Sequence, residues 1–103
     1  MAWVKVASVT DLNDGEMLPV EVEGNELAVC QAGEDYFVIS NICTHALAYL
    51  SDGFLDEFLI ECPLHAGCFD IRTGAGQGLP ITEDLKTYPV QVSDGDILVE
   101  IGN

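Results

Sequence analysis

The chain has 103 residues, of which 49% are hydrophobic, and this predicts a single domain with a modest core rather than two domains. Its formal charge of −15, from 18 acidic and three basic residues, disfavours nucleic acid and anionic membranes as partners, because both are negatively charged. Its apolar runs are far shorter than the roughly 20 residues of a membrane-spanning helix, and no secretory signal is visible, so we expect a soluble, cytoplasmic monomer.

Short runs of β-branched and aromatic residues, separated by turn residues, indicate an all-β domain. Turn residues at 24–25, 33–35 and 94–95 lie between successive runs and predict antiparallel hairpins. The runs that contain Pro19 and Pro89 are expected at sheet edges or at bulges, because proline cannot donate to a strand ladder. In chain order, the predicted strands are Val4–Ala7, Met17–Val22, Glu26–Gln31, Tyr36–Ser40, Phe58–Glu61, Thr87–Val92 and Ile97–Ile101.

The segment from Asn41 to about Thr82 differs from the flanking halves of the chain. It holds both histidines, two of the four prolines and a glycine-rich run over residues 73–78. The glycine-rich run lacks the lysine of a phosphate-binding loop, so we assign it no nucleotide site. The pattern predicts an antiparallel β scaffold that carries a loop-rich insert.

Two short Cys-His units in this insert hold both histidines of the chain: Cys43-Thr44-His45 and Cys62-Pro63-Leu64-His65. A lone cysteine or histidine is ordinarily a structural residue, but four donors at such short spacings favour metal ligation. Two thiolates and two imidazoles suit either a tetrahedral zinc ion or an iron-sulfur cluster. Zinc fingers group cysteines with cysteines and histidines with histidines, whereas each unit here supplies one of each, which favours a cluster.

The remaining cysteines, Cys30 and Cys68, receive no role in this interpretation. Cys30 lies in a predicted strand, where a buried free thiol is the ordinary expectation. Without a visible export signal, disulfides are not expected.

The two units, with the Phe69-Asp70 pair that trails the second, resemble the C-x-H and C-P-x-H motifs of Rieske proteins. Length, strand pattern and Pro80 extend the resemblance to bacterial Rieske ferredoxins of multicomponent aromatic-ring dioxygenases. The resemblance implies a Rieske fold over residues 1–103, a β-sandwich with a cluster-binding subdomain at approximately 41–82 and a third cluster loop at Pro80. It also implies one 2Fe-2S cluster, with Cys43 and Cys62 on one iron and His45 and His65 on the other.

The same resemblance implies an electron carrier rather than an enzyme. Such a carrier takes single electrons from a flavin-containing ferredoxin reductase and passes them to a terminal Rieske oxygenase. Acidic residues near the second unit, Asp52, Asp56, Glu57 and Glu61, are expected to guide docking onto basic partner surfaces. Two alternatives stay open: a small Rieske subunit of another oxidoreductase, such as nitrite reductase, and a zinc-stabilised interaction module.

Overall fold

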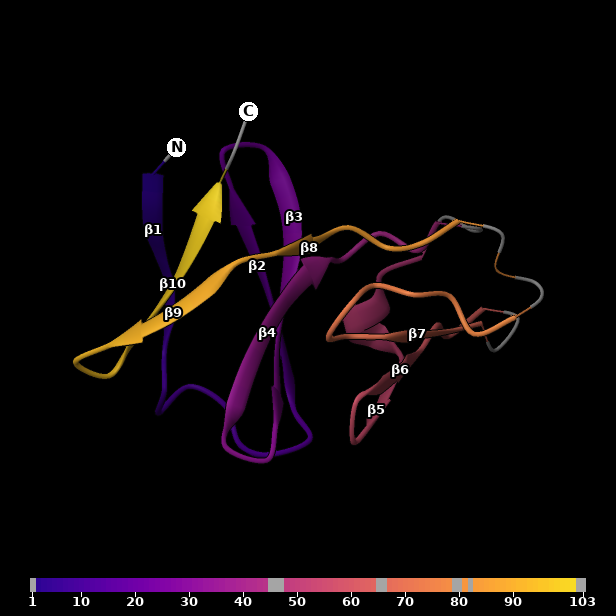
Figure 1. The fold of residues 1–103 in the computed structure, drawn as a ribbon, viewed down its shortest axis with the longest axis horizontal. Coiled ribbons are helices and arrows are strands. Elements are labelled where there is room, and N and C mark those ends of the chain that lie inside the picture. The colour runs from indigo at the N-terminus through magenta and orange to yellow at the C-terminus, as the bar shows by residue number, and fades with distance from the viewer. Residues whose placement is uncertain (1, 45–47, 65–66, 79–80, 82, 102–103) are drawn as a thin grey trace.

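The computed structural model describes residues 2–44, 48–64, 67–78, 81 and 83–101, and it confirms the predicted all-β class. The described residues form three antiparallel sheets and one short 3-10 helix, η1 (Leu50–Asp52) (Figure 1). The first sheet has the order β1 (Ala2–Ser8), β10 (Asp96–Ile101), β9 (Val90–Ser93). The second has the order β2 (Met17–Val22), β3 (Asn25–Ala32), β4 (Asp35–Ser40), β8 (Thr87–Tyr88). The third has the order β5 (Phe54–Asp56), β6 (Leu59–Glu61), β7 (Cys68–Asp70).

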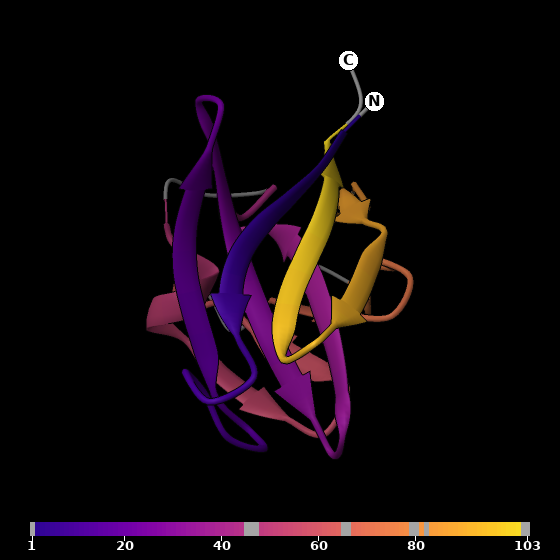
Figure 2. The same ribbon diagram turned by 90° about the vertical axis from the view of Figure 1, so that its left-hand side faces the viewer.

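The first two sheets pack face to face as a β-sandwich (Figure 2). Alternate residues of β10 point into it, so that Ile97, Val99 and Ile101 are buried while their neighbours are partly exposed. Leu27 and Val29 of β3 meet them from the second sheet. This apolar cluster is the core of the scaffold.

Strand β3 is buried on both of its faces, which explains its uninterrupted apolar run Leu27-Ala28-Val29-Cys30. Leu27 and Val29 belong to the sandwich core. Ala28 and Cys30 belong to a second apolar cluster, which they share with Ile60 and Phe69 of the third sheet and with the two site cysteines. The scaffold therefore supports the third sheet through the back of β3.

The hairpin turns follow the expected chemistry. Glu23 and Gly24 have φ of 51° and 82° between β2 and β3, and Asp94 and Gly95 have φ of 52° and 82° between β9 and β10. Two successive left-handed residues are the signature of a type I′ turn, whose twist matches that of the strands it joins. The expectation differs in two details: Asn25 begins β3 and Asp35 begins β4, rather than lying in the turns.

Both prolines act as predicted, but Pro89 does more than mark an edge. Pro19 lies in β2, which is the edge strand of its sheet. Pro89 divides the predicted strand Thr87–Val92 into β8 and β9, which pair with different sheets. A residue without an N–H suits the point where the chain leaves one ladder for another.

The insert contains more regular structure than expected. Besides the strand at 59–61, β5, β7 and η1 lie within it, none of which was predicted. The limits of residues 41–82 for a subdomain stay a prediction. No helix among the described residues has the length and hydrophobicity to cross a membrane.

Candidate metal centre

The structure brings Cys43 and Cys62 together. Both are buried, with relative exposures of 4% and 1%, and neither forms a disulfide. Burial raises the pKa of the Cys62 thiol above its ordinary value, a backbone hydrogen bond at Leu64 lowers it, and a hydrogen bond with Cys43 raises it again. Two thiols from residues 19 positions apart therefore interact directly in an apolar surrounding.

Each cysteine begins a loop that is closed by an equivalent backbone hydrogen bond. The N–H of Cys43 donates to the carbonyl of Ala48 at 3.0 Å, and the N–H of Cys62 donates to the carbonyl of Gly67 at 2.6 Å. His45 and His65 lie outside the described residues, so the structure does not place these two predicted ligands. In the sequence, each lies between the donor and the acceptor of one of these hydrogen bonds.

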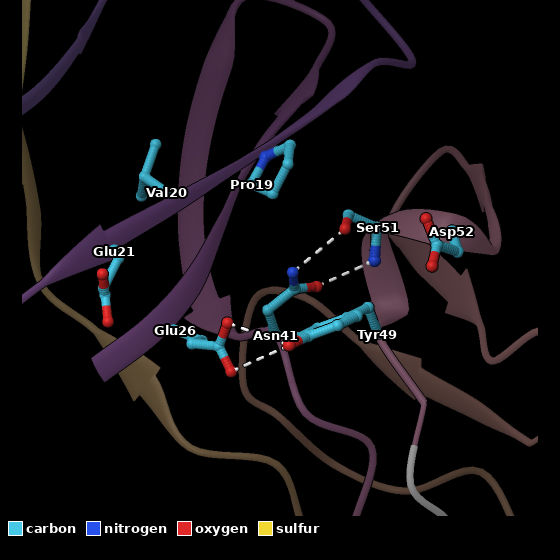
Figure 3. Close-up of a pocket in the computed structure, with 8 residues that line it drawn as sticks. All are labelled: Pro19, Val20, Glu21, Glu26, Asn41, Tyr49, Ser51 and Asp52. Carbon is cyan, nitrogen blue, oxygen red and sulfur yellow. Dashed lines mark hydrogen bonds between the residues drawn. The ribbon is translucent and has the colours of Figure 1, made fainter. Parts of the chain in front are cut away.

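The first loop begins and ends at one junction with the scaffold, shown in Figure 3. Asn41, which is buried, donates from Nδ2 to Ser51 Oγ at 3.0 Å and accepts from the Ser51 N–H at 2.8 Å. The Tyr49 hydroxyl donates to the Glu26 carboxylate of β3 at 3.0 and 3.1 Å, and this hydrogen bond raises the pKa of Tyr49. These contacts fix both ends of the first loop against β3.

A groove of about 400 Å³ lies over this junction, lined by Pro19, Val20, Glu21, Glu26, Asn41, Tyr49, Ser51 and Asp52 (Figure 3). Sequence reasoning missed the junction, because its contacts join residues 10 and 23 positions apart.

Gly53 lets the end of η1 approach the second cysteine loop. It caps η1 with φ of −92°, a value that any residue adopts. A Cβ at this position would overlap the backbone carbonyl oxygen of Glu61 and lie 3.1 Å from the ring of Pro63. The absence of a side chain therefore allows η1 to lie close to the second loop.

A segment at the end of the insert and just beyond it packs against the same site. The Thr44 hydroxyl donates to the carbonyl of Glu83 at 3.0 Å, and the N–H of Leu85 donates to the carbonyl of Gly74 at 2.7 Å. Leu85 and Ile81 are buried in the apolar cluster that holds both site cysteines. Pro80, expected in this third loop, lies outside the described residues.

Arg72 contacts both Asp70 of β7 and the aromatic ring of Phe58. Its guanidinium makes hydrogen bonds of 3.0 and 2.8 Å to the Asp70 carboxylate, and its Cζ lies 4.2 Å from the centroid of the Phe58 ring. Phe58 in turn meets Phe37 of β4 edge to face, with ring centroids 6.0 Å apart. The hydrogen bonds from Arg72 hold the pKa of Asp70 below its usual range.

The two other cysteines behave as expected for thiols without a role in ligation. Cys30 is free and fully buried in β3, and burial raises its pKa to about 12. Cys68 on β7 is half-buried, and its pKa is raised first by burial and then by the charge of Glu61.

The donor set fits a 2Fe-2S cluster bound by two thiolates and two imidazoles. Two thiols interact directly in a buried position, and each lies at the start of a short loop that holds one histidine in its sequence. Among the described residues no group of three or more metal-binding side chains occurs, as expected when both histidines lie outside them. A metal centre with this set would need Cys43, Cys62, His45 and His65 together.

Comparison with known proteins gives a consistent result. The family of Rieske 2Fe-2S domains matches residues 2–89. The ferredoxin component of the naphthalene 1,2-dioxygenase system of Pseudomonas putida is 38% identical over 99 residues, which cover 96% of this chain and 95% of the relative.

Solved structures agree with these matches. The ferredoxin of carbazole 1,9a-dioxygenase from Nocardioides aromaticivorans IC177 is 40% identical, with a TM-score of 0.92 over 96% of this chain and 97% of that one. A chain in a complex of reduced oxygenase and oxidised ferredoxin of carbazole 1,9a-dioxygenase is 37% identical, with a TM-score of 0.89 over 94% of this chain and 91% of that one.

Proposed function

Because the chain belongs to the Rieske 2Fe-2S domain family, we propose that it passes single electrons from a flavin-containing reductase to the terminal oxygenase of an aromatic-ring dioxygenase system. In this proposal Cys43, His45, Cys62 and His65 hold one 2Fe-2S cluster. The observation that carries it is the buried pair of interacting thiols at Cys43 and Cys62, which form no disulfide.

The bound cluster would supply reversible one-electron exchange. The chain's own residues hold the ligand loops in place: the backbone hydrogen bonds of Cys43 and Cys62 fix the loop ends, and Gly53 allows η1 to lie close to the second loop. Buried Ile81 and Leu85 pack in the same apolar cluster and exclude water from the thiols. The chain is thus an electron-transfer component and not the oxygenase that acts on the aromatic compound.

The proposed partners follow from the relatives and from the charge of the chain. The structure of a related ferredoxin in complex with its oxygenase has been solved, which supports an oxygenase as the electron acceptor of this chain. The reductase as electron donor, the cytoplasmic location and the monomeric state remain predictions. Asp52 of η1 and Asp56 and Glu57 of the β5–β6 hairpin are exposed, and this hairpin leads into Cys62, which supports docking onto basic partner surfaces.

The two alternative functions predict different properties. A zinc module would be colourless and would contain no acid-labile sulfide, whereas a cluster gives a red-brown protein. The relatives reported above are ferredoxins of dioxygenase systems, which favours a carrier over a nitrite reductase subunit.

Spectroscopy on anaerobically purified protein tests the proposal. We expect about two irons and two sulfides per chain. After reduction with dithionite, we expect a paramagnetic resonance signal with average g below the free-electron value. Cys43→Ser and His45→Ala should each abolish this signal, while the matched Cys68→Ser variant should retain it. A colourless protein without iron, or an unchanged signal in His45→Ala, would contradict the assignment.

A further inference from the structure

The third sheet has one face in the core and one face in solvent. Leu55, Ile60 and Phe69 lie opposite one another across β5, β6 and β7 and pack into the apolar cluster beneath the site. Because side chains alternate along strands, the residues on either side of this row point away from the core. These six residues, here called the outer face, are Phe54, Glu61 and Cys68 in one row and Asp56, Leu59 and Asp70 in the other.

The outer face carries two large apolar side chains where a solvated sheet ordinarily carries polar ones. Phe54 is 68% exposed, the largest value among the exposed large hydrophobic residues of the described chain, and Leu59 is 43% exposed. Phe54 pairs with Glu61, so Leu59 is its diagonal neighbour and lies within reach of an aromatic ring. Two large apolar side chains at neighbouring positions of one exposed face, unlike scattered single residues, favour a contact surface.

Carboxylates surround this apolar pair, and nothing described in the chain neutralises them. Asp56, Glu57 and Glu61 are on or beside the outer face. Of the three basic side chains, Lys5 pairs with Asp96, Lys86 lies over the ring of Tyr88, and Arg72 pairs with Asp70 of the outer face. In the described part of the chain, none of them pairs with Asp56, Glu57 or Glu61. The complementary surface is therefore an apolar patch ringed by lysine or arginine.

The position of the outer face suits an electron-transfer partner. Strand β6 leads directly into Cys62, and Gly53, next to Phe54, contacts the Pro63 position of the second loop. Leu64, in that loop, is also exposed, at 45%. A partner seated on Phe54 and Leu59 would therefore lie against a strand that ends one residue before a proposed ligand.

We propose that the outer face docks the terminal oxygenase, with Phe54 and Leu59 as apolar anchors and Asp56 and Glu61 as the charged rim. This proposal rests on the proposed electron-carrier function. A three-stranded sheet of three-residue strands buries little area, in keeping with the small interfaces of transient redox complexes. A second copy of this chain would bring two charges of −15 together, which opposes self-association through the same face.

The test uses reduced holoprotein and the terminal oxygenase of the carbazole 1,9a-dioxygenase of Nocardioides aromaticivorans IC177, whose own ferredoxin is 40% identical to this chain. Stopped-flow absorbance gives the second-order rate constant for electron transfer to the oxygenase. The variants are Phe54→Ser and Leu59→Ser, both at exposed positions. The matched control is Val92→Ser, since Val92 is 48% exposed on β9 of the scaffold.

We expect each outer-face variant to lower the rate constant about tenfold, as is typical for apolar anchors of an interface, with Val92→Ser unchanged. Visible spectra and midpoint potentials should be the same in all proteins, which separates lost docking from a damaged site. Wild-type holoprotein that cannot be reduced and reoxidised by a single electron would contradict the proposed function itself. Wild-type transfer with equal rates in Phe54→Ser, Leu59→Ser and Val92→Ser would overturn the outer-face proposal alone. Dimers in sedimentation that Phe54→Ser abolishes would identify a second copy as the occupant and overturn it as well.

Discussion

The hydroxyl of Thr44 donates a 3.0 Å hydrogen bond to the backbone carbonyl of Glu83, 39 residues further along the chain. Thr44 lies between the proposed ligands Cys43 and His45, and Glu83 follows the position of Pro80 by three residues. One side-chain contact thus joins the first ligand loop to the segment that packs Leu85 beneath the site.

Replacing Thr44 by valine should loosen this connection without changing the volume of the side chain. We expect a loss of about 1 kcal/mol in the free energy of unfolding, because the Glu83 carbonyl loses a partner. The visible absorbance of the cluster should decay faster on incubation with an iron chelator. Thr44→Ser keeps the hydroxyl and serves as the control. Equal decay rates in the two variants would show that the hydrogen bond does not secure the loop.

Gly53→Ala should damage the site through steric overlap with the second loop. The new Cβ would meet the carbonyl of Glu61 and force apart η1 and the second loop, at a cost of about 1–3 kcal/mol. Iron content per chain should fall. The control is Gly33→Ala, where φ of 66° strains the backbone but nothing lies within 4 Å of the new atom. That variant should lose stability and keep its iron; equal iron loss in both would rule out a specific role for Gly53.

Much of the scaffold was predictable because each local signal agreed with the final structure. The seven predicted strands all correspond to observed strands, and the left-handed turn residues Gly24 and Gly95 close hairpins as expected. In β10 the burial alternates, with Ile97 and Val99 buried and Leu98 between them partly exposed, although all three residues are apolar and the sequence alone does not show which face is the core. The four-residue apolar run in β3 reflects burial on both faces of the strand. The prediction of a strand at this position does not by itself include that property.

The rest of the site depends on contacts between distant residues, which no local sequence pattern indicates. Strands β5 and β7 have three residues each, too few to show a period of two. The Asn41 amide and the Gly53 backbone act on residues 10 and eight positions away, a relationship that only the folded chain creates. Short spacing in the sequence was enough to pair Cys43 with Cys62, because each begins a similar loop.

Arg72→Gln should weaken the protein in a pH-dependent way. The pKa of Asp70 is lowered chiefly by its hydrogen bond from Arg72, so this contact stabilises the fold above the unfolded pKa of about 4 and is lost as pH falls through the lower folded value. We expect a lower urea midpoint than wild type at pH 7, with the two midpoints converging below about pH 4. Arg72→Lys keeps the charge without the paired hydrogen bonds and should resemble Arg72→Gln. A gap that stays constant down to pH 3 would exclude this origin.

Cys30 should resist alkylation in the native protein. With its pKa raised to about 12 by burial, its thiolate fraction at pH 8 is on the order of 10⁻⁴, and the side chain is fully buried. Incubation with iodoacetamide followed by peptide mass spectrometry should find Cys30 unmodified, and unfolding in urea should make it fully reactive. Modification of Cys30 in native protein as fast as in urea would show that β3 opens on the time scale of the reaction.

Electron transfer to an oxygenase should slow as ionic strength rises. A chain with charge −15 is attracted to a basic docking surface at long range, and salt screens this attraction over a Debye length of about 8 Å at 0.15 M. The charges that matter should be those near the second loop, so Asp52→Asn with Asp56→Asn should lower the rate constant at low salt and flatten its salt dependence.

The pair Glu23→Gln with Asp94→Asn changes the net charge equally, but at two scaffold turns between β2 and β3 and between β9 and β10. If steering comes from the charge beside the second loop, the scaffold pair should keep a steep salt dependence. If it comes from net charge alone, both pairs should behave alike. A wild-type rate constant that does not change with salt would exclude electrostatic steering. Association would then depend on the apolar contacts of Phe54 and Leu59 alone.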